Sequence, residues 1–306
     1  MKHFIGALAM TTTLTAAPLA NATPEDEATI KTIVESVGLL ADRHEFDALE
    51  KLYADEFMLD YSSLSGAPAE VKSPQALMTE WASVLPGFDR TRHALSDVRT
   101  TIDGDQAAAT ANVEAGHWVD GAYWQVDGQY DYQLERQAGT WKIISMTFSL
   151  EDETGSRDVF GPAIEAATAN PASYIQRQQT RQAVLDFLTG LEEKDMEKVN
   201  GVWADDAVQH MPYVPDGWSH KVIGKEGLIA QYAGWPEAAG KATFTDKIIF
   251  YPMADPQTVY VEFKGVVDII PTGRTYRQTY GENGKITLYR EYFDPREFER
   301  AFGLAN

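Results

Sequence analysis

The sequence predicts an α+β fold that is repeated as two tandem copies of one domain. A pattern that runs from Val34 to Asp60 returns 150 positions later (184 − 34), from Val184 to His210, with its apolar, acidic and aromatic positions in step. In both copies, residues with helical periodicity are followed by long alternating strands, which is typical of the α+β class. The 306 residues of the chain are more than one core usually serves, whereas two domains of about 130–140 residues are ordinary. Self-similarity at such a long period indicates a duplicated domain.

The first copy begins with helical periodicity over residues 27–42 and again over 45–54, followed by a short strand at 57–61 and a loop. Ser73 and Pro74 predict the start of a third helix, because a serine N-cap and a proline in the first turn are strong start signals. Pro86 and Gly87 end this helix. The rest of the copy alternates and predicts four long antiparallel strands, at 93–102, 107–119, 123–136 and 141–150.

The second copy repeats this order. Helices are expected at 181–192, 196–203 and 225–233, and strands at 207–212, 243–251, 258–270, 275–280 and 285–293. Asn283 and Gly284 predict a hairpin turn. The intervening residues are irregular and contain several prolines and glycines, with a short helix expected at 162–169. We therefore expect a first domain at 23–155, a linker at 156–175 and a second domain at 176–306.

Residues 1–22 have the pattern of a secretory signal peptide. A basic start precedes an apolar stretch, and Ala20-Asn21-Ala22 supplies the small-x-small cleavage pattern. The alternatives are a disordered leader or a membrane anchor, but the apolar run is shorter than the ~20 residues that span a bilayer. We therefore expect export to the periplasm or secretion, with a mature chain that starts at Thr23 and has no membrane span.

The composition excludes several classes of function. The chain has 26 basic and 46 acidic residues, with a formal net charge of −20, which argues against nucleic acid or an anionic membrane surface as a partner. It contains no cysteine, so disulfide and thiol chemistry are excluded. We find no Gly-rich phosphate loop, no Gly-x-Ser-x-Gly elbow and no His-Glu-x-x-His pair. The sequence therefore predicts no metal site and no cofactor. The expected partner is a small-molecule ligand.

Both copies resemble the nuclear transport factor 2-like superfamily. The first copy is similar to its scytalone dehydratase and dehydrochlorinase branch, through Asp42, FDRTRH at 88–93 and GTWKI at 139–143. The second copy resembles the SnoaL and phenazine-biosynthesis branch, through GKITLYREYFDP at 284–295. The resemblance implies two cone-shaped domains, each a curved antiparallel sheet wrapped on about three helices, with a ligand pocket inside.

In the first copy, the resemblance places a catalytic dyad on Asp42 and His93. A base that removes a proton needs a second group to hold it in its productive tautomer. An aspartate at the C-terminal end of a helix is disfavoured by the helix dipole, so Asp42 needs a partner. The alternative is that Asp42 is a solvated helix end and His93 an ordinary strand residue. His117 resembles the second pocket histidine of scytalone dehydratase, or is a rim histidine beside Trp118.

The last strand of the first copy departs from the dehydrochlorinase pattern. That enzyme has an arginine that helps a halide to leave, and Met146 stands at the matching position. Alternation puts Met146 and Phe148 on one face of the strand. This apolar face offers no cation to a leaving anion. Dehydrochlorination is therefore not expected, whereas dehydration, isomerisation or simple binding of an apolar molecule remain.

In the second copy, Tyr289, Glu291 and Phe293 share one face of the last strand. A carboxylate among aromatic rings loses hydration, so we expect a raised pKa that suits a general acid or base. The alternative is a surface glutamate paired with Arg290, although alternation points the two side chains to opposite faces. The resemblance also implies that Glu291 is a pocket acid.

Three further residues complete the candidate site of the second copy. His210 stands at the place of an asparagine that helps to hold the attacking water in limonene epoxide hydrolase. Tyr276 and Tyr280 are candidate hydrogen-bond donors to a carbonyl or enolate. The Arg-x-Asp of that hydrolase has no clear match here, so hydrolysis by its mechanism is not expected.

Together these residues predict a cofactor-free lyase or isomerase that transfers a proton on a small, largely apolar molecule. The alternative is a non-catalytic periplasmic binding or pseudo-enzyme module, because folds of this superfamily host both. We expect the two pockets to be unequal and the second one to work alone, because Glu291 can act by itself as proton donor and acceptor, whereas His93 needs Asp42 to fix its tautomer. The two copies are further expected to pack as an intramolecular pseudo-dimer, or the chain as a homodimer.

Overall fold

The structure is a computed structural model that describes residues 23–215, 217–285 and 288–304, without the side chains of residues 276–290. The predicted signal peptide lies outside the described residues. The chain divides into two compact units, Met1–Ile164 and Glu165–Asn306, so the division falls inside the predicted linker. No helix in the described ranges is long and apolar enough to cross a membrane.

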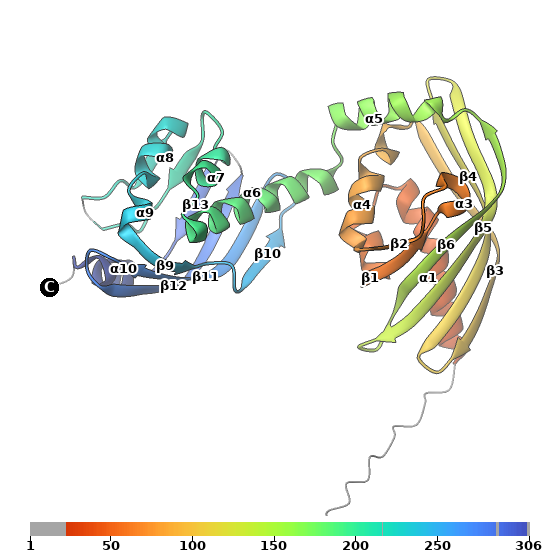
Figure 1. Cartoon of the computed structure of the whole chain (residues 1–306), viewed down its shortest axis with the longest axis horizontal. Coiled ribbons are helices and arrows are strands. Elements are labelled where there is room, and N and C mark those ends of the chain that lie inside the picture. The colour runs from red at the N-terminus through yellow and green to blue at the C-terminus, as the bar shows by residue number, and fades with distance from the viewer. Residues whose placement is uncertain (1–22, 216, 286–287, 305–306) are drawn as a thin grey trace, which may run out of the picture. The chain divides into compact units, whose positions relative to one another are not determined.

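The first unit is a six-stranded sheet that curves around its helices (Figure 1). Its strands lie in the order β2-β1-β6-β5-β4-β3, and all neighbours are antiparallel except β1 and β6. The strands are β1 (Tyr53–Asp60), β2 (Glu70–Lys72), β3 (Arg90–Asp103), β4 (Gln106–Val119), β5 (Ala122–Gln137) and β6 (Thr140–Gly155). The helices are α1 (Pro24–Asp42), α2 (Phe46–Leu49), η1 (Glu50–Leu52), α3 (Ser62–Ser65), α4 (Pro74–Ala82), η2 (Leu85–Gly87), η3 (Arg157–Val159) and α5 (Phe160–Ala169), of which α5 crosses the division between the units.

Local signals set the helix starts in the first unit. Thr23 and Asp26 form a capping box at the start of α1, in which each side chain accepts a hydrogen bond from the other residue's backbone N–H. At α4 the Ser73 hydroxyl accepts a hydrogen bond from the backbone N–H of Ala76, as the Ser-Pro pair predicts. The apolar stripe of α1, with Ile30 and Val34 fully buried, packs towards the sheet. This packing anchors the end of α1, and with it Asp42, beside β3.

The second unit repeats the strand order of the first. Its path is β10-β11-β12-β13-β7-β8, with β9 also paired to β11, and β13 is parallel to β7 as β6 is to β1. The strands are β7 (Val208–His210), β8 (Lys221–Ile223), β9 (Ala239–Thr243), β10 (Ile248–Pro252), β11 (Val259–Ile269), β12 (Arg274–Lys285) and β13 (Leu288–Tyr292). The helices are α6 (Ser173–Glu193), α7 (Met196–Gly201), α8 (Lys225–Tyr232), α9 (Trp235–Ala238) and α10 (Pro295–Phe302). The α+β fold with curved antiparallel sheets is thereby confirmed for both copies.

Several predicted boundaries are wrong in the second unit. The strand expected at 243–251 is split into β9 and β10, and both pieces pair with β11. Helix α6 begins at Ser173 rather than at residue 181. Strand β12 continues through Asn283 and Gly284, which pair with Arg290 and Tyr289 of β13, so the predicted turn at these two residues is not formed. Pairing with β11 on the other side extends as far as Gly284, and this ladder outweighs the local turn signal.

Candidate functional site

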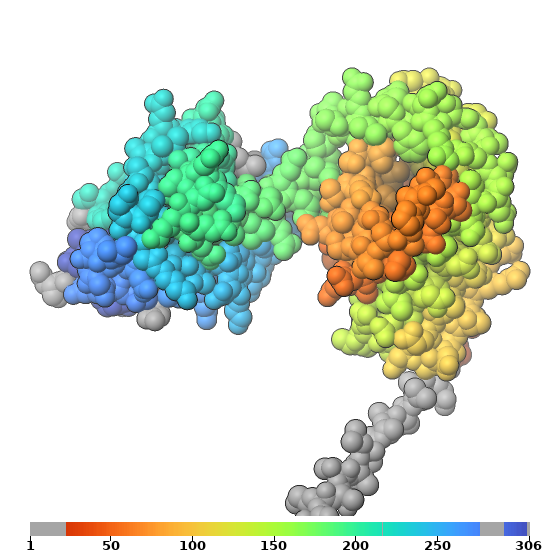
Figure 2. Space-filling view, viewed as in Figure 1, coloured from red at the N-terminus to blue at the C-terminus, as the bar shows by residue number. Residues whose placement is uncertain are grey.

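The first unit contains a cavity of about 170 Å³. Figure 2 shows a recess in this unit between the orange segment that contains α3 and α4 and the green segment that contains α5. The walls are mainly aromatic and aliphatic, with two histidines and two tyrosines as the groups that can exchange protons. The lining residues are Tyr61, Leu64, Trp81, Val84, Leu85, His93, Ala115, His117, Trp124, Val126, Tyr130, Phe148 and Phe160.

Asp42 and His93 come together beside this cavity. Asp42 lies at the end of α1, and one of its carboxylate oxygens is 2.7 Å from Nδ1 of His93. The same carboxylate accepts hydrogen bonds from the His93 backbone N–H at 2.7 Å and from the Thr91 hydroxyl at 2.8 Å. Burial opposes ionisation of Asp42, but the hydrogen bonds from His93 and Thr91 outweigh it and hold the pKa below its ordinary value. Asp42 is thus an ionised acceptor at neutral pH.

A glycine allows this pair to form. A Cβ atom on Gly38 would lie 2.7 Å from Cβ of His93, a distance that side chains essentially never show. The absence of a side chain at Gly38 therefore lets α1 approach β3 closely enough for Asp42, one helical turn later, to reach the imidazole.

His117 lies next to His93 on the neighbouring strand. The two rings are perpendicular, with centroids 5.4 Å apart. Burial, and secondarily the charge of His93, lowers the pKa of His117 to about 3, so its ring is neutral at physiological pH. Its Nδ1 atom is buried and has no hydrogen-bond partner among the described residues. The neutral ring can therefore exchange a hydrogen bond with a polar atom of a ligand.

Two tyrosines that the sequence analysis did not single out form another polar point of the cavity. Tyr61 follows β1, Tyr130 lies on β5, and both line the cavity. Burial raises the pKa of both hydroxyls, which a side-chain hydrogen bond links to each other. Because a tyrosine hydroxyl can both donate and accept, one proton of the pair stays available to a ligand. That Tyr130 lines the cavity could be recognised only from the pairing of β5 with β6, in which Tyr130 stands opposite the lining residue Phe148.

The residues after β6 close the first cavity. Phe160, at the start of α5, packs against Phe88, His117 and Trp124, with ring centroids 5.0–6.2 Å apart. Arg157 bonds to Glu153 and, at 3.1 Å, to the carbonyl of Leu64, which also lines the cavity. The first part of the predicted linker is therefore a wall of the first cavity.

The other candidates in the first unit lie in different places. Phe148 lines the cavity as expected. Met146 is fully buried but is not among the lining residues, and its sulfur accepts a hydrogen bond from the Tyr53 hydroxyl at 3.5 Å. Trp118 is on the opposite face of β4 from His117, where the Arg90 guanidinium stacks 3.8 Å from its ring centre.

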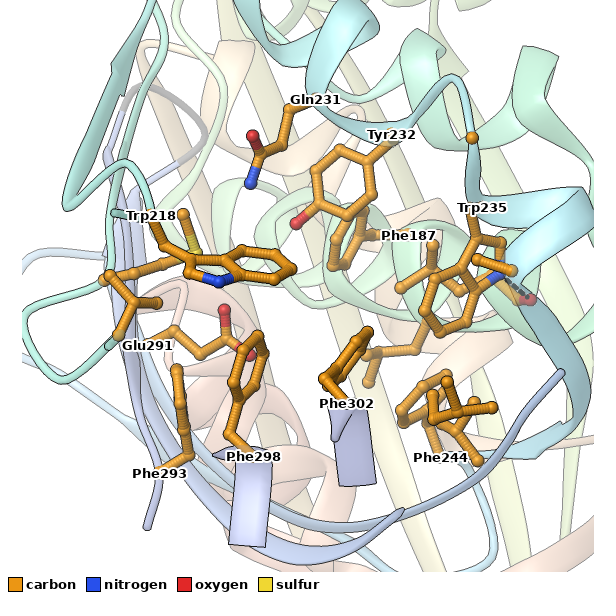
Figure 3. Close-up of a pocket in the computed structure, with 18 of the residues that line it drawn as sticks. Phe187, Trp218, Gln231, Tyr232, Trp235, Phe244, Glu291, Phe293, Phe298 and Phe302 are labelled. Carbon is orange, nitrogen blue, oxygen red and sulfur yellow. Dashed lines mark hydrogen bonds between the residues drawn. The ribbon is translucent and has the colours of Figure 1, made fainter. Parts of the chain in front are cut away.

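The second unit contains a larger cavity, of about 340 Å³ (Figure 3). Its size is at the lower end of the ~300–1,000 Å³ typical of small-molecule pockets. The walls are predominantly apolar and aromatic, and Glu291 supplies the carboxylate. The lining residues are Phe187, Leu188, Leu191, Met211, Val214, Trp218, Gln231, Tyr232, Gly234, Trp235, Ala238, Phe244, Phe263, Val267, Ile269, Glu291, Phe293, Phe298 and Phe302.

Glu291 has the raised pKa that its aromatic neighbours predict. Burial raises the pKa of Glu291 to about 7, against the lowering effect of a hydrogen bond from Gln209. That bond is long, at 3.5 Å between Gln209 Nε2 and the carboxylate. Gln209 is itself fully buried, and its Nε2 also donates to the Tyr232 hydroxyl at 2.6 Å. Glu291 is therefore close to half-ionised at neutral pH.

Gln209, rather than His210, reaches this site. The two residues are neighbours on β7, so their side chains point to opposite faces. His210 is not among the lining residues of the cavity. The side chains of Tyr276, Tyr280 and Tyr289 lie outside the described residues, so their expected roles stay predictions.

Glu192, the counterpart of Asp42, has a different partner. Its carboxylate accepts hydrogen bonds from the backbone N–H groups of Phe244 and Thr245 and from the Thr245 hydroxyl at 2.9 Å. The acid at the end of the first helix thus binds an imidazole in one unit and the backbone of the β9–β10 connection in the other. Among the described residues, no group of three or more His, Asp or Glu side chains is arranged to hold a metal ion.

Comparisons with known proteins relate both halves to one family. Profiles of the SnoaL-like domain match residues 22–147 and 184–286. The uncharacterised protein YesE of Bacillus subtilis is 33% identical over 122 residues, which cover 38% of this chain and 82% of YesE. The uncharacterised PhzA/B-like protein PA3332 of Pseudomonas aeruginosa is 29% identical over 128 residues, 40% of this chain and 89% of that protein. The crystal structure of Kfla4162 from Kribbella flavida is 27% identical, with a TM-score of 0.40, and covers 42% of this chain and 93% of its own.

Proposed function

This chain belongs to the SnoaL-like family, with one such domain in each half, and on that premise we propose that it is a cofactor-free lyase or isomerase. The fold is one whose members include cofactor-free isomerases and dehydratases. The proposed reaction is proton transfer on a small, largely apolar molecule in the first cavity. The observation that carries the proposal is the Asp42–His93 pair at the cavity wall.

His93 is the proposed base. An ionised Asp42 can only accept a hydrogen bond, so Nδ1 of His93 carries the ring proton and Nε2 keeps its lone pair. His93 lines the cavity and Asp42 does not, so Nε2, at the far edge of the ring, is the nitrogen available to a substrate. The carboxylate also stabilises the imidazolium that forms when Nε2 takes a proton.

The remaining polar groups suit a substrate that carries a carbonyl or hydroxyl group. In the lyase reaction, a C–H proton passes to Nε2, a carbon–carbon double bond forms, and the hydroxyl on the adjacent carbon takes that proton from the imidazolium and leaves as water. In the isomerase reaction, the same proton returns to a different carbon. Tyr130 and neutral His117 can hydrogen-bond to the oxygen on which charge develops. The described lining residues include no lysine or arginine, which disfavours expulsion of an anion such as a halide.

The test is exchange of carbon-bound hydrogen in deuterated water, followed by nuclear magnetic resonance on a panel of small cyclic and aryl ketones and their β-hydroxy derivatives. The parent protein should accelerate exchange or loss of water for at least one member of the panel. His93→Gln should lower that rate by about 10²–10⁴, the usual contribution of a general base. Asp42→Asn should lower it as well, because the amide no longer fixes the Nδ1–H tautomer.

Glu291→Gln is the comparison variant, because it changes the other cavity and keeps the shape of the side chain. It should leave the rate unaltered. Loss of the reaction in Glu291→Gln, with His93→Gln unaffected, would place the chemistry in the second cavity. Unaltered rates in all three variants would leave a ligand-binding protein as the better description.

A further inference from the structure

The second cavity is polarised along its length. In Figure 3 the Glu291 carboxylate lies at one end, and Trp235 and Phe244 lie at the other, where the Trp235 ring N–H bonds to the carbonyl of Leu191. No lysine, arginine or histidine is among the described lining residues, and Tyr232 is the other titratable group among them. A ligand that fills this space therefore meets the Glu291 carboxylate, the polar groups of Gln231 and Tyr232 and otherwise mainly apolar surface. Among the described lining residues, an anionic ligand would find no counter-charge.

Aromatic rings surround the carboxylate. In Figure 3 the Glu291 side chain lies among Phe293, Phe298 and Trp218. The Trp218 and Phe298 rings are perpendicular, with centroids 4.9 Å apart, and Phe302 lies 5.6 Å from Trp218. The faces of such rings carry negative potential and attract organic cations. Rings and carboxylate thus favour the same sign of charge in a ligand.

Among the described residues, the carboxylate receives one weak hydrogen bond. Its donor, Gln209 Nε2, is 3.5 Å away, which is at the limit of a hydrogen bond. A carboxylate in an apolar cavity must be neutralised by a proton or by a cation, and the pKa of about 7 shows how readily a proton takes that place. The chain as a whole carries a formal charge of −20, which attracts cations to its surface and repels anions.

We propose that the second cavity binds a hydrophobic organic ammonium ion. The ammonium group pairs with Glu291 beside the faces of Trp218 and Phe298, and the apolar body of the ligand extends towards Trp235 and Phe244. The volume of about 340 Å³ suits a ligand with one aromatic ring and a short alkyl chain. This proposal does not depend on the proton transfer proposed for the first cavity. It concerns the other unit, and its test measures binding and not turnover.

The test uses three probes of nearly the same shape and different charge, phenylbutylammonium, phenylbutanol and phenylbutanoate. Their binding to the full chain is measured by isothermal titration calorimetry at pH 8, where Glu291 is mainly ionised. The ammonium should bind about 10-fold or more tightly than the alcohol, as charge-assisted contacts exceed neutral ones. The carboxylate probe should not bind measurably.

Two variants locate the ammonium. Glu291→Gln keeps the shape of the side chain and removes its charge, so the preference for ammonium over alcohol should shrink to about 2-fold or less. Phe298→Leu removes one aromatic face and keeps an apolar side chain, so it should weaken ammonium binding more than alcohol binding. His93→Gln, in the first cavity, should leave the affinities of the ammonium and the alcohol unchanged.

The pH dependence gives a further signature. Because the ammonium needs an ionised Glu291, its affinity should fall by up to about 10-fold for each pH unit below 7 in the parent. The affinity should be flat with pH in Glu291→Gln. The proposal is overturned if the alcohol binds the parent as tightly as the ammonium, if Glu291→Gln keeps the preference, if His93→Gln abolishes binding, or if none of the three probes binds.

Discussion

Replacing Glu291 with glutamine should stabilise the second unit at alkaline pH and leave its stability almost unchanged in acid. Burial holds the folded-state pKa of Glu291 at about 7, above the ordinary value of 4.5. The folded state therefore binds the proton more tightly than the unfolded chain does. The stability that this proton contributes is present below pH 4.5 and is lost as the pH rises through 7. Glutamine has no proton to lose and avoids that cost.

The size of the effect follows from the pKa change. Each tenfold change in an ionisation constant equals about 1.4 kcal/mol, so a pKa that moves from 4.5 to about 7 corresponds to at most about 3.5 kcal/mol. Glu291 keeps part of its surface in contact with solvent, and screening reduces the expected gain to about 1–3 kcal/mol. For a domain of this size, the gain should raise the melting temperature of the second unit by about 3–10 °C at pH 8.5.

The assay is differential scanning calorimetry of the full-length parent and variant at pH 4, 6 and 8.5, with hydrogen exchange and mass spectrometry to assign the transition to the second unit. Glu192→Gln is the matched control in the same unit. Its carboxylate accepts backbone hydrogen bonds that an amide replaces only in part, so it should destabilise by about 1.5–3 kcal/mol. The reasoning is refuted if the Glu291→Gln variant is less stable than the parent at pH 8.5. It is also refuted if the difference in stability between the two proteins does not change with pH.

Four further predictions concern the first unit and the whole chain. Gly38→Ala should push α1 away from β3, destabilise the first unit by about 1–3 kcal/mol, and broaden the downfield proton resonance of the His93 Nδ1–H. Asp42→Asn should destabilise this unit by about 1.5–3 kcal/mol at neutral pH. Folding lowers the pKa of Asp42, so the difference in stability between parent and variant should shrink as the pH falls below about 4. Chain recovered from a periplasmic fraction should begin at Thr23 on N-terminal sequencing, and an intact Met1 would contradict export. If the units pack as a pseudo-dimer, each should be less stable when expressed alone, and two soluble monomers as stable as the whole would contradict it.

The duplicated α+β architecture could be predicted because it rests on local periodicity. Helical and alternating patterns repeat at an offset of 150 positions, and both sheets have corresponding strand orders. What local patterns could not show is the break between β9 and β10, where one strand was expected. Glu192, about 50 positions earlier in the chain, bonds to the backbone of Phe244 and Thr245 in that break. A contact between distant residues decides the break, and no property of the strand residues signals it.

The candidate sites depend on contacts that single-sequence patterns leave open. Asp42 and His93 are adjacent only because Gly38 permits close packing, and a glycine inside a helical pattern otherwise indicates only weak helix propensity. The sequence pattern places Phe160 in a linker, whereas the structure places it in the lining of the first cavity. In the second unit the polar residue of β7 was expected to be His210, and Gln209 holds that place. A shift of one residue in a three-residue strand exchanges the two faces, and pairing with β8 and β13 sets which face is buried.

The two units place their ionisable groups at different positions of one scaffold. Strand pairing sets Met58 opposite Ser145 in the first unit and Val208 opposite Leu288 in the second, so that Phe148 and Glu291, three residues further along, hold equivalent places. Both residues line their cavities. The first unit thus has an apolar ring where the second has its carboxylate.

At the end of the first helix of each unit, it is the first unit that has the acid–imidazole pair and the second that lacks it. Leu188 stands at the position of Gly38, 150 residues later, and is buried, so the second unit lacks the glycine that brings α1 and β3 together. The acid at the end of its first helix, Glu192, accepts hydrogen bonds from backbone N–H groups instead. A dyad that fixes an imidazole suits removal of a proton, whereas a lone carboxylate among aromatic rings suits capture of a positive charge. If both proposals hold, duplication separates proton transfer and cation binding into two cavities of one chain.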